Sequence, residues 1–330
     1  MKKIFASHIA EFLEQELCGS DVTIESVKAI DEYKDKSISF LTKYPDEDLF
    51  SRNGLLIISD KIKLPSESCS SYIISKNPRL DVAKIVDKFF NNQIFIDLRD
   101  QSFISEKASL AKDVIIGANC YIGDRVVIGS GTIINHNVVI SGKTKIGQNC
   151  YFKSGSVIGE DGFGFDFDND RTPIRIPHIG KVVISDDVEI GANNTVVRAT
   201  YGTTIIGKNT KTDDHVHIAH NCKIGENCII TASAELSGSV NVGHDVWIGP
   251  NSSIMNNITL GNYSMIGLGS VVTKNIPEFC LTAGSPARQL GWMSKTRKRL
   301  ELPIKTEKPI RVELDGNSYV LEGSMLKLEL

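Results

Sequence analysis

An aliphatic residue returns at every sixth position through a large part of the chain. The period holds through residues 104–158, 184–196 and 206–272, and two breaks separate these three runs. Within them, Phe152 and Thr212 are the members that are not aliphatic. A hydrophobic period of six residues is typical of a parallel β-helix.

Three six-residue units form one coil of such a helix, so a side chain recurs one coil further on after eighteen residues. Neighbouring coils pack at strand spacing, roughly 4.8 Å. The aliphatic first position fills the interior, and the small fifth position packs beside it. Gly or Asp often follows at the second position, where we expect a corner with backbone angles that glycine adopts at little cost.

A different pattern precedes the repeat. Residues 1–101 alternate short apolar runs with amphipathic stretches, which predicts a small α/β domain. We expect helices at 7–17 and 80–90, and four strands at the following segments: 22–24, 38–41, 55–58 and 72–74.

The repeat and the tail complete the predicted domain organisation. Residues 102–277 form the β-helix, with an inserted loop at 159–183. In the tail, 278–330, we expect a short helix at 295–299, and Asp315-Gly-Asn317 between two apolar runs predicts a β-hairpin. The fold class is therefore mainly β, with an α/β domain at the N-terminus and a helix and hairpin at the C-terminus.

Composition excludes some classes of function. The net charge is −3 and basic residues cluster only at 295–299, so we expect no nucleic-acid partner. The sequence contains no apolar run long enough to cross a membrane and no signal-peptide core, which predicts a cytoplasmic protein. Four of the seven cysteines occupy the inward fifth position, and none forms a C-x-x-C motif. We therefore expect core thiols, with neither disulfides nor a metal site.

The phase of the repeat places chemically active residues together. If both breaks are loops that leave the coil frame intact, the third repeat positions form one column on the outer surface. This column contains Glu160, Arg198, His220, Gly238, Asn256 and Lys274. Such a mixture is unsuited to packing, and it predicts the wall of an active-site groove.

The first break resembles a known family. Its ends, Gly159-Glu-Asp-Gly-Phe-Gly-Phe165 and Ile176-Pro-His-Ile-Gly180, together with the segment 188–195, are similar to the UDP-3-O-acylglucosamine N-acyltransferases of lipid A synthesis. The resemblance covers most of residues 1–265. It implies a left-handed β-helix and a homotrimer in which each active site lies between two subunits.

The resemblance also assigns catalytic roles. His220 lies in Ile218-Ala-His-Asn221, a segment that carries the catalytic base in several hexapeptide acyltransferases. An amine that attacks a thioester must lose a proton, and histidine titrates close to working pH. One coil further, Gly238 would direct its backbone N–H at the developing oxyanion. The alternative is that His220 is an ordinary surface histidine.

Further residues are candidates for binding the acceptor, a nucleotide-linked amino sugar. We expect Arg198, Asp213 and the loop aromatics Phe163 and Phe165 to hold sugar or diphosphate. Three more candidates lie near the base: His217, Asn256 and Asn257.

In the N-terminal domain the family holds the uracil ring between two aromatic side chains. Phe40 and Tyr44 are the nearest counterparts in this chain. The alternative is that both residues simply pack that domain.

The C-terminal half departs from the family. Asn257 stands where the family has a second histidine, and the family ends in helices that help to dock acyl carrier protein. Here the segment from Gly267 to Gly291 resembles the end of coenzyme A-dependent sugar acetyltransferases. This predicts acyl-CoA as a co-substrate rather than a bound cofactor, contacted by Lys274, Arg288, Ser270 and Ala283. The alternative is that Lys274 and Arg288 only solubilise an exposed edge.

The sequence thus favours an enzyme that moves an acyl group from acyl-CoA to the amino group of a dTDP- or UDP-linked amino sugar for surface polysaccharide. The first alternative is UDP-3-O-(3-hydroxyacyl)glucosamine N-acyltransferase, which uses acyl carrier protein. A remoter one is a zinc hydrolyase of the carbonic anhydrase type, because His215 and His220 have the spacing of two zinc ligands and His178 is a candidate third. A non-catalytic β-helix is the last.

Overall fold

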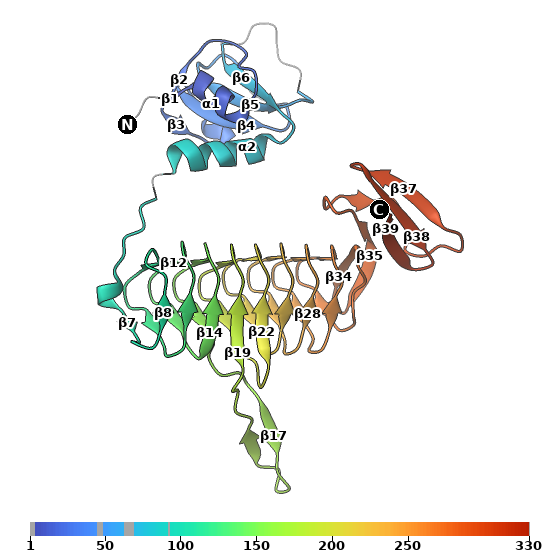
Figure 1. The fold of residues 1–330 in the computed structure, drawn as a ribbon. Helices are drawn as coiled ribbons and strands as arrows, with labels where there is room; N and C mark the ends of the chain where they lie inside the picture. The colour runs from blue at the N-terminus through green and yellow to red at the C-terminus, as the bar shows by residue number, and fades with distance from the viewer. Residues whose placement is uncertain (1–3, 45–48, 63–68, 92, 330) are drawn as a thin grey trace. The chain divides into compact units, whose positions relative to one another are not determined.

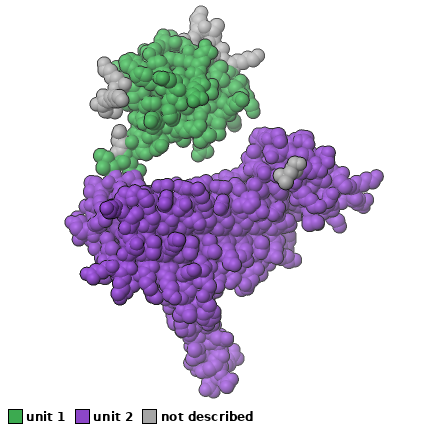
Figure 2. Space-filling model, in the orientation of Figure 1, with its two compact units in different colours: residues 1–94 green, residues 95–330 purple. Residues whose placement is uncertain are grey.

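The computed structural model describes residues 4–44, 49–62, 69–91 and 93–329. The chain divides into two compact units, residues 1–94 and 95–330 (Figures 1 and 2). The division falls seven residues before the sequence-based boundary after residue 101, and the C-terminal tail belongs to the same unit as the β-helix.

The first unit is the expected small α/β domain. Its parallel sheet has the order β3-β4-β5-β6, and α1 and α2 pack against it in one apolar cluster. All five residues of β5 are buried, as a central strand of a parallel sheet requires. The elements are β1 (Ile4–Phe5), α1 (Ala6–Leu13), β2 (Thr23–Ile24), β3 (Ser26–Val27), a 3₁₀ turn (Ile30–Glu32), β4 (Ser37–Leu41), β5 (Leu55–Ser59), β6 (Ser71–Ser75), α2 (Pro78–Ile85) and a π-helical turn (Val86–Phe90).

The second unit is a β-helix built from three parallel sheets of very short strands, entered through a 3₁₀ turn at Arg99–Gln101 (Figure 1). Sheet I contains β7 (Phe103–Ile104), β10 (Tyr121–Ile122), β13 (Val139–Ile140), β16 (Val157–Ile158), β21 (Thr195–Val196), β24 (His217–Ile218), β27 (Glu235–Leu236), β30 (Ser253–Ile254) and β33 (Val271–Val272). Sheet II contains β8 (Ser109–Leu110), β11 (Val127–Ile128), β14 (Lys143–Ile146), β19 (Lys181–Ile184), β22 (Thr203–Ile206), β25 (Lys223–Ile224), β28 (Asn241–Val242) and β31 (Thr259–Leu260). Sheet III begins with β9 (Ile115–Ile116), β12 (Ile133–Ile134), β15 (Tyr151–Phe152), β20 (Glu189–Ile190), β23 (Lys211–Thr212), β26 (Ile229–Ile230), β29 (Trp247–Ile248) and β32 (Met265–Ile266).

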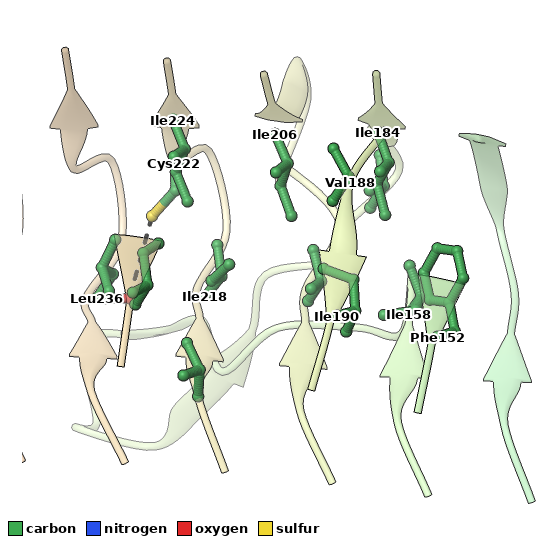
Figure 3. Close-up of a cluster of buried hydrophobic side chains, with 14 of the residues drawn as sticks. Phe152, Ile158, Ile184, Val188, Ile190, Ile206, Ile218, Cys222, Ile224 and Leu236 are labelled. Atoms are coloured by element: carbon green, nitrogen blue, oxygen red, sulfur yellow. Dashed lines mark hydrogen bonds between the residues drawn. The ribbon is translucent and has the colours of Figure 1, made fainter. Parts of the chain in front are cut away.

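The interior of the β-helix is filled as the period predicts. Nearly all first-position side chains are buried, including Phe152, and together they form one continuous cluster (Figure 3). The four fifth-position cysteines lie inside this cluster, and all seven cysteines are free thiols. Burial raises the pKa of Cys150, Cys222 and Cys228 to about 11, so these thiols stay protonated and act as small apolar residues.

The backbone angles at the coil corners differ from the expectation that the second repeat position would adopt unusual values. Left-handed backbone angles occur at the fourth repeat position, often in asparagine, such as Asn119, Asn137 and Asn221. Glycine at the second position serves a different purpose, because the next coil lies very close there. A β-carbon added at Gly225 would lie 2.5 Å from the carbonyl oxygen of Gly243. Close stacking of coils, rather than an unusual φ, therefore favours glycine at second positions such as that of Gly225.

The described part of the tail contains strands joined by turns and loops, and no helix. Sheet III ends in β34 (Cys280–Gly284), β35 (Ala287–Met293) and β36 (Arg299–Leu300). A separate antiparallel sheet follows, formed by β37 (Ile310–Leu314), β38 (Asn317–Glu322) and β39 (Met325–Glu329).

This arrangement confirms the predicted hairpin and shows that the helix expected at 295–299 is wrong. That segment is a turn, in which Arg297 has a φ of 61° and the chain reverses into β36. Buried Trp292 and Tyr319 pack in one apolar cluster that joins the small sheet to the end of the β-helix. Among the described residues, no helix is long and apolar enough to span a membrane.

Candidate active site

The first break in the repeat is a hairpin that projects from the rod (Figure 1). It contains β17 (Phe165–Phe167) and β18 (Pro173–Arg175), which pair antiparallel. The chain leaves the coil after Ile158 and rejoins it at β19, and the sheets continue on both sides. In sheet I, Ile158 pairs with Val196 and Val196 pairs with Ile218, so neither break disturbs the coil frame.

The predicted column therefore exists. Each of its six members follows a strand of sheet I, and these strands are consecutive neighbours in the order β16, β21, β24, β27, β30 and β33. All six members consequently lie at the corner between sheets I and II. The column and the hairpin arise from the same edge of the rod.

A groove of about 550 Å³ opens beside this corner. Its lining includes Glu160, Phe163, His217, His220, Glu235 and Gly238. The outgoing stem of the hairpin forms one wall, and the outer face of sheet I forms the floor. Phe163 is 88% exposed, and its ring centroid lies 4.9 Å from that of Phe165.

Asn221 determines which ring nitrogen of His220 carries the proton. The amide oxygen of Asn221 accepts hydrogen bonds from the backbone N–H and the hydroxyl of Thr200, at 2.9 and 3.2 Å. Because an N–H can only donate, the atom that faces Thr200 must be the amide oxygen. The same oxygen lies 3.2 Å from Nδ1 of His220, so Nδ1 carries the proton. Nε2 of the neutral ring is thereby left with its lone pair and can act as a base.

Gly238 lies directly against this ring. A β-carbon at Gly238 would lie 2.5 Å from Cε1 and 2.7 Å from Nε2 of His220, so any side chain would displace the imidazole. The carbonyl of Gly238 accepts a hydrogen bond from the N–H of Asn257 at 3.1 Å. Its own N–H donates to no group in the described part of the chain, and it remains available to an oxyanion.

His178, which the sequence suggested only as a zinc ligand, packs against His220. Its side chain is 3% exposed, and its ring lies edge-on to that of His220 with centroids 5.2 Å apart. Nδ1 of His178 donates to the carbonyl of Ile176 at 2.9 Å, and Nε2 is buried without a partner in the described structure. A β-carbon at Gly162 would lie 2.6 Å from this Nε2, and one at Gly164 would lie 2.8 Å from Cε1. The two glycines of the family-like motif thus make room for His178.

Arg198 ties the two stems of the hairpin together. Its guanidinium donates to the carbonyls of His178 and Gly159, at 2.6 and 2.8 Å, and to the carboxylate of Asp161. These contacts occupy three of its five N–H groups. Arg198 therefore fixes the base of the hairpin, and its guanidinium lines a second, smaller cavity beyond the groove.

Two groove residues that the sequence analysis did not select accompany His217. Thr195, His217 and Glu235 stack in register on β21, β24 and β27. Oγ1 of Thr195 lies 2.5 Å from Nδ1 of His217. The carboxylates of Glu235 and Glu160 form no hydrogen bond or ion pair with the described residues, and no lysine or arginine lines the groove. The groove is consequently suited to a cationic group, such as an ammonium ion.

Some predicted acceptor-binding residues lie outside the groove. Asp213 lies at the corner between sheets III and I, and its carboxylate accepts from the N–H of Asp214. Asn256 and Asn257 are exposed at the corner one coil beyond Gly238. The groove is therefore formed by fewer of the selected residues than the sequence suggested.

Phe40 and Tyr44 do not form an aromatic pair. Phe40 packs against the cluster that includes both helices of its domain. Tyr44 is 59% exposed, and its ring centroid lies 5.8 Å from that of Phe50. Successive residues of a strand face opposite sides of the sheet, and Phe40 faces the same side as Ile38, away from buried Leu41 and Phe50.

The four residues predicted to contact coenzyme A do not share one environment. Ser270 is fully buried, and its hydroxyl donates to the carbonyl of Gly267 at 2.6 Å, so it fills the core and is unavailable to a ligand. Ala283 lies on β34, where it packs against Gly267. Lys274 and Arg288 are exposed at this end of the rod.

The structure does not assemble the three histidines of the zinc alternative. His215 lies at the corner between sheets III and I, whereas His178 and His220 meet at the corner between sheets I and II. The described residues contain no group of three or more His, Cys, Asp or Glu side chains that could hold a metal ion.

Comparisons with known proteins identify the repeat and a relative that matches most of the chain. Residues 125–160, 203–238 and 239–274 match the family model described as bacterial transferase hexapeptide (six repeats). The UDP-3-O-acylglucosamine N-acyltransferase of Campylobacter lari is 35% identical over 303 residues, which cover 87% of this chain and 94% of that protein. The enzyme of the same name from Methylococcus capsulatus is 41% identical, over 42% of this chain and 39% of that protein.

Solved structures show the same fold. LpxA from Acinetobacter baumannii is 30% identical and has a TM-score of 0.55, covering 60% of this chain and 74% of that one. The UDP-N-acetylglucosamine O-acyltransferase of Moraxella catarrhalis is 27% identical and has a TM-score of 0.54, covering 60% and 75%. These matches confirm the expected left-handed β-helix.

The environment of His217 gives a testable prediction. Burial lowers the pKa of His217 below the ordinary value of 6.5, and His220 lowers it further, whereas Glu235 opposes the shift. In a titration of ¹³C-labelled histidine followed by NMR, we expect the midpoint of His217 to lie below 6.5. Glu235→Gln should move the midpoint lower still, because the variant removes the opposing charge. A midpoint that rises in Glu235→Gln would contradict this description of the groove.

Proposed function

The chain belongs to the family of UDP-3-O-acylglucosamine N-acyltransferases, and from this premise we propose that it transfers an acyl group from a thioester to the amino group of a UDP-linked amino sugar. The observation that carries the proposal is the pairing of His220 with Gly238. Within the described structure, the base has a free Nε2 and lies beside a backbone N–H that donates to no other group. The relatives favour the lipid A acceptor, UDP-3-O-acylglucosamine, over the polysaccharide sugars that the sequence analysis preferred.

The proposed reaction uses each of these groups once. The amino group enters the groove as an ammonium ion, attracted by the carboxylates of Glu235 and Glu160. The ammonium ion first gives one proton to water, which leaves a neutral amine. Nε2 of His220 then removes a second proton as the amine nitrogen attacks the thioester carbonyl, and the N–H of Gly238 stabilises the oxyanion. Collapse of the intermediate breaks the C–S bond and forms the amide. The thiolate leaves with the proton that His220 had accepted.

The donor in this proposal is a 3-hydroxyacyl group on acyl carrier protein. A second candidate, acyl-CoA with another nucleotide-linked amino sugar, is supported by the C-terminal end. There, β34 and β35 form a hairpin, and the described residues after 278 contain no helix. In addition, the side chains of Lys274 and Arg288 are exposed and form no ion pair with a described residue, and they would suit the phosphates of coenzyme A.

We also retain the proposal of a homotrimer. The hairpin and its surroundings expose large apolar side chains, among them Phe163, Phe167, Ile174, Ile179 and Tyr201. A projecting apolar element of this kind is typical of a surface that another copy of the chain covers.

A thiol-release assay tests the proposed function. We expect rapid release with 3-hydroxyacyl carrier protein and UDP-3-O-acylglucosamine, and little release when either is omitted. Release from acyl-CoA with dTDP- or UDP-linked amino sugars, but not from acyl carrier protein, would favour the second candidate. If no thioester releases its thiol with any amino sugar, the chain is not an acyltransferase of this type.

The contact between Gly238 and His220 gives a mutational prediction. Gly238→Ala should lower kcat/KM about 10²-fold or more, towards the value for His220→Ala, because the new methyl group displaces the base. Gly202→Ala is a matched control, since a β-carbon there meets nothing within 4 Å and should leave activity unchanged. Both variants should melt within a few degrees of wild type. Wild-type activity in Gly238→Ala would refute the proposed arrangement of base and oxyanion donor.

A further inference from the structure

The second cavity on the β-helix differs in charge from the groove. It has a volume of about 320 Å³ and is walled by the returning stem of the hairpin at Ile179 and Gly180. Among the described residues, three cationic side chains line it, those of Arg125, Lys143 and Arg198, and no carboxylate does. The groove on the other side of the stems contains carboxylates and no lysine or arginine. The two cavities are therefore suited to ligand groups of opposite charge.

Two of these cations make no direct polar contact with the described residues. The side chains of Arg125 and Lys143 form no hydrogen bond or ion pair with any residue that the structure describes. Asp124, the carboxylate adjacent to Arg125, is already held by Oγ of Ser105 at 2.5 Å and by Nζ of Lys107 at 3.0 Å. Asp124 still interacts electrostatically with Arg125, and Asp161 pairs with Arg198, but neither Arg125 nor Lys143 is held by a direct contact to a carboxylate of the described residues.

The neighbouring strands add to this charge. Lys143 on β14 pairs in register with Lys181 on β19, and both side chains are exposed on the outer face of sheet II. Like charges at directly paired positions destabilise a sheet. A bound anion would relieve this repulsion.

The third cation is held in a fixed position. Arg198 is fastened to both hairpin stems through three of its N–H groups, which leaves two to donate elsewhere. Its side chain passes close to Gly142, where a β-carbon would lie 3.6 Å from Cδ of Arg198 and 3.0 Å from the carbonyl oxygen of Gly159. Gly142 also has a φ of 65°, which favours glycine. Both the close neighbouring atoms and the backbone angle therefore favour glycine at this wall of the cavity. The cavity is thus partly preorganised around a planar donor.

We propose that this cavity binds a diphosphate group. Arginine presents paired donors that match phosphate oxygens, and lysine adds a mobile point charge. The volume lies in the range of small-ligand sites. This identification of the ligand rests on the proposed function. Under that function, a diphosphate occurs in the nucleotide of the acceptor and, for the second donor candidate, in coenzyme A. The binding itself does not depend on turnover.

Binding of three probes to the full chain tests the proposal by calorimetry: pyrophosphate, UDP and coenzyme A. The variants are Arg125→Gln, Lys143→Gln and the double variant. Lys223→Gln is the matched control, because Lys223 is exposed on the same sheet three coils away and forms no ion pair with a described residue. Unchanged thermal melting would show that each variant is folded.

We expect each single variant to weaken pyrophosphate binding about tenfold and the double variant to weaken it further, as for loss of a charged hydrogen bond. UDP should weaken in parallel if the acceptor supplies the diphosphate, and coenzyme A should if the donor does. Wild-type affinity of the double variant for all three probes would overturn the proposal. Because no turnover is measured, a chain that fails the thiol-release assay can still support this site, and an active chain can still refute it.

Discussion

Backbone hydrogen bonds between successive coils are the constraint on which the rest of this structure depends. They require the chain to return to the same position of the coil after each circuit, whatever path it takes in between. The circuit from Ile158 to Val196 takes 38 residues and that from Val196 to Ile218 takes 22, yet both pairs are in register. Extra residues can therefore leave the rod only at a corner. That is where the hairpin arises and where polar side chains can gather without disturbing the core.

The arrangement of functional side chains at the corner between sheets I and II follows from this constraint on register. Stacking brings His220 against Gly238, and only a glycine can lie beneath the ring. Asn221, held by Thr200, directs the protonated nitrogen of His220 away from the groove. The hairpin stems then separate an anionic cavity from a cationic one, with Arg198 fastened between them. The acceptor that we propose carries both an ammonium group and a diphosphate.

The sequence predicted what depends on the period and missed what depends on side-chain contacts. The coil frame, the column and the inward cysteines follow from spacing alone, since the eighteen-residue repeat fixes which residues stack. The contact of His178 with His220 could not be predicted, because it depends on how the hairpin folds back across the rod. Ser270 was wrongly predicted to contact coenzyme A. It occupies the inward fifth repeat position, which already indicated burial, but the resemblance to coenzyme A-dependent acetyltransferases was given more weight. Glu235 had a sequence signal, its place one coil beyond His217, that was not used.

The proposed reaction forms an amide on a UDP-linked amino sugar. Mass spectrometry of the product from UDP-3-O-acylglucosamine and a 3-hydroxyacyl carrier protein tests this most directly. We expect a sugar nucleotide heavier by one hydroxyacyl group, in which the new bond survives mild alkali that hydrolyses esters. A product whose added acyl group is lost under mild alkali, or an acceptor of unchanged mass with every thioester donor, would contradict the claim.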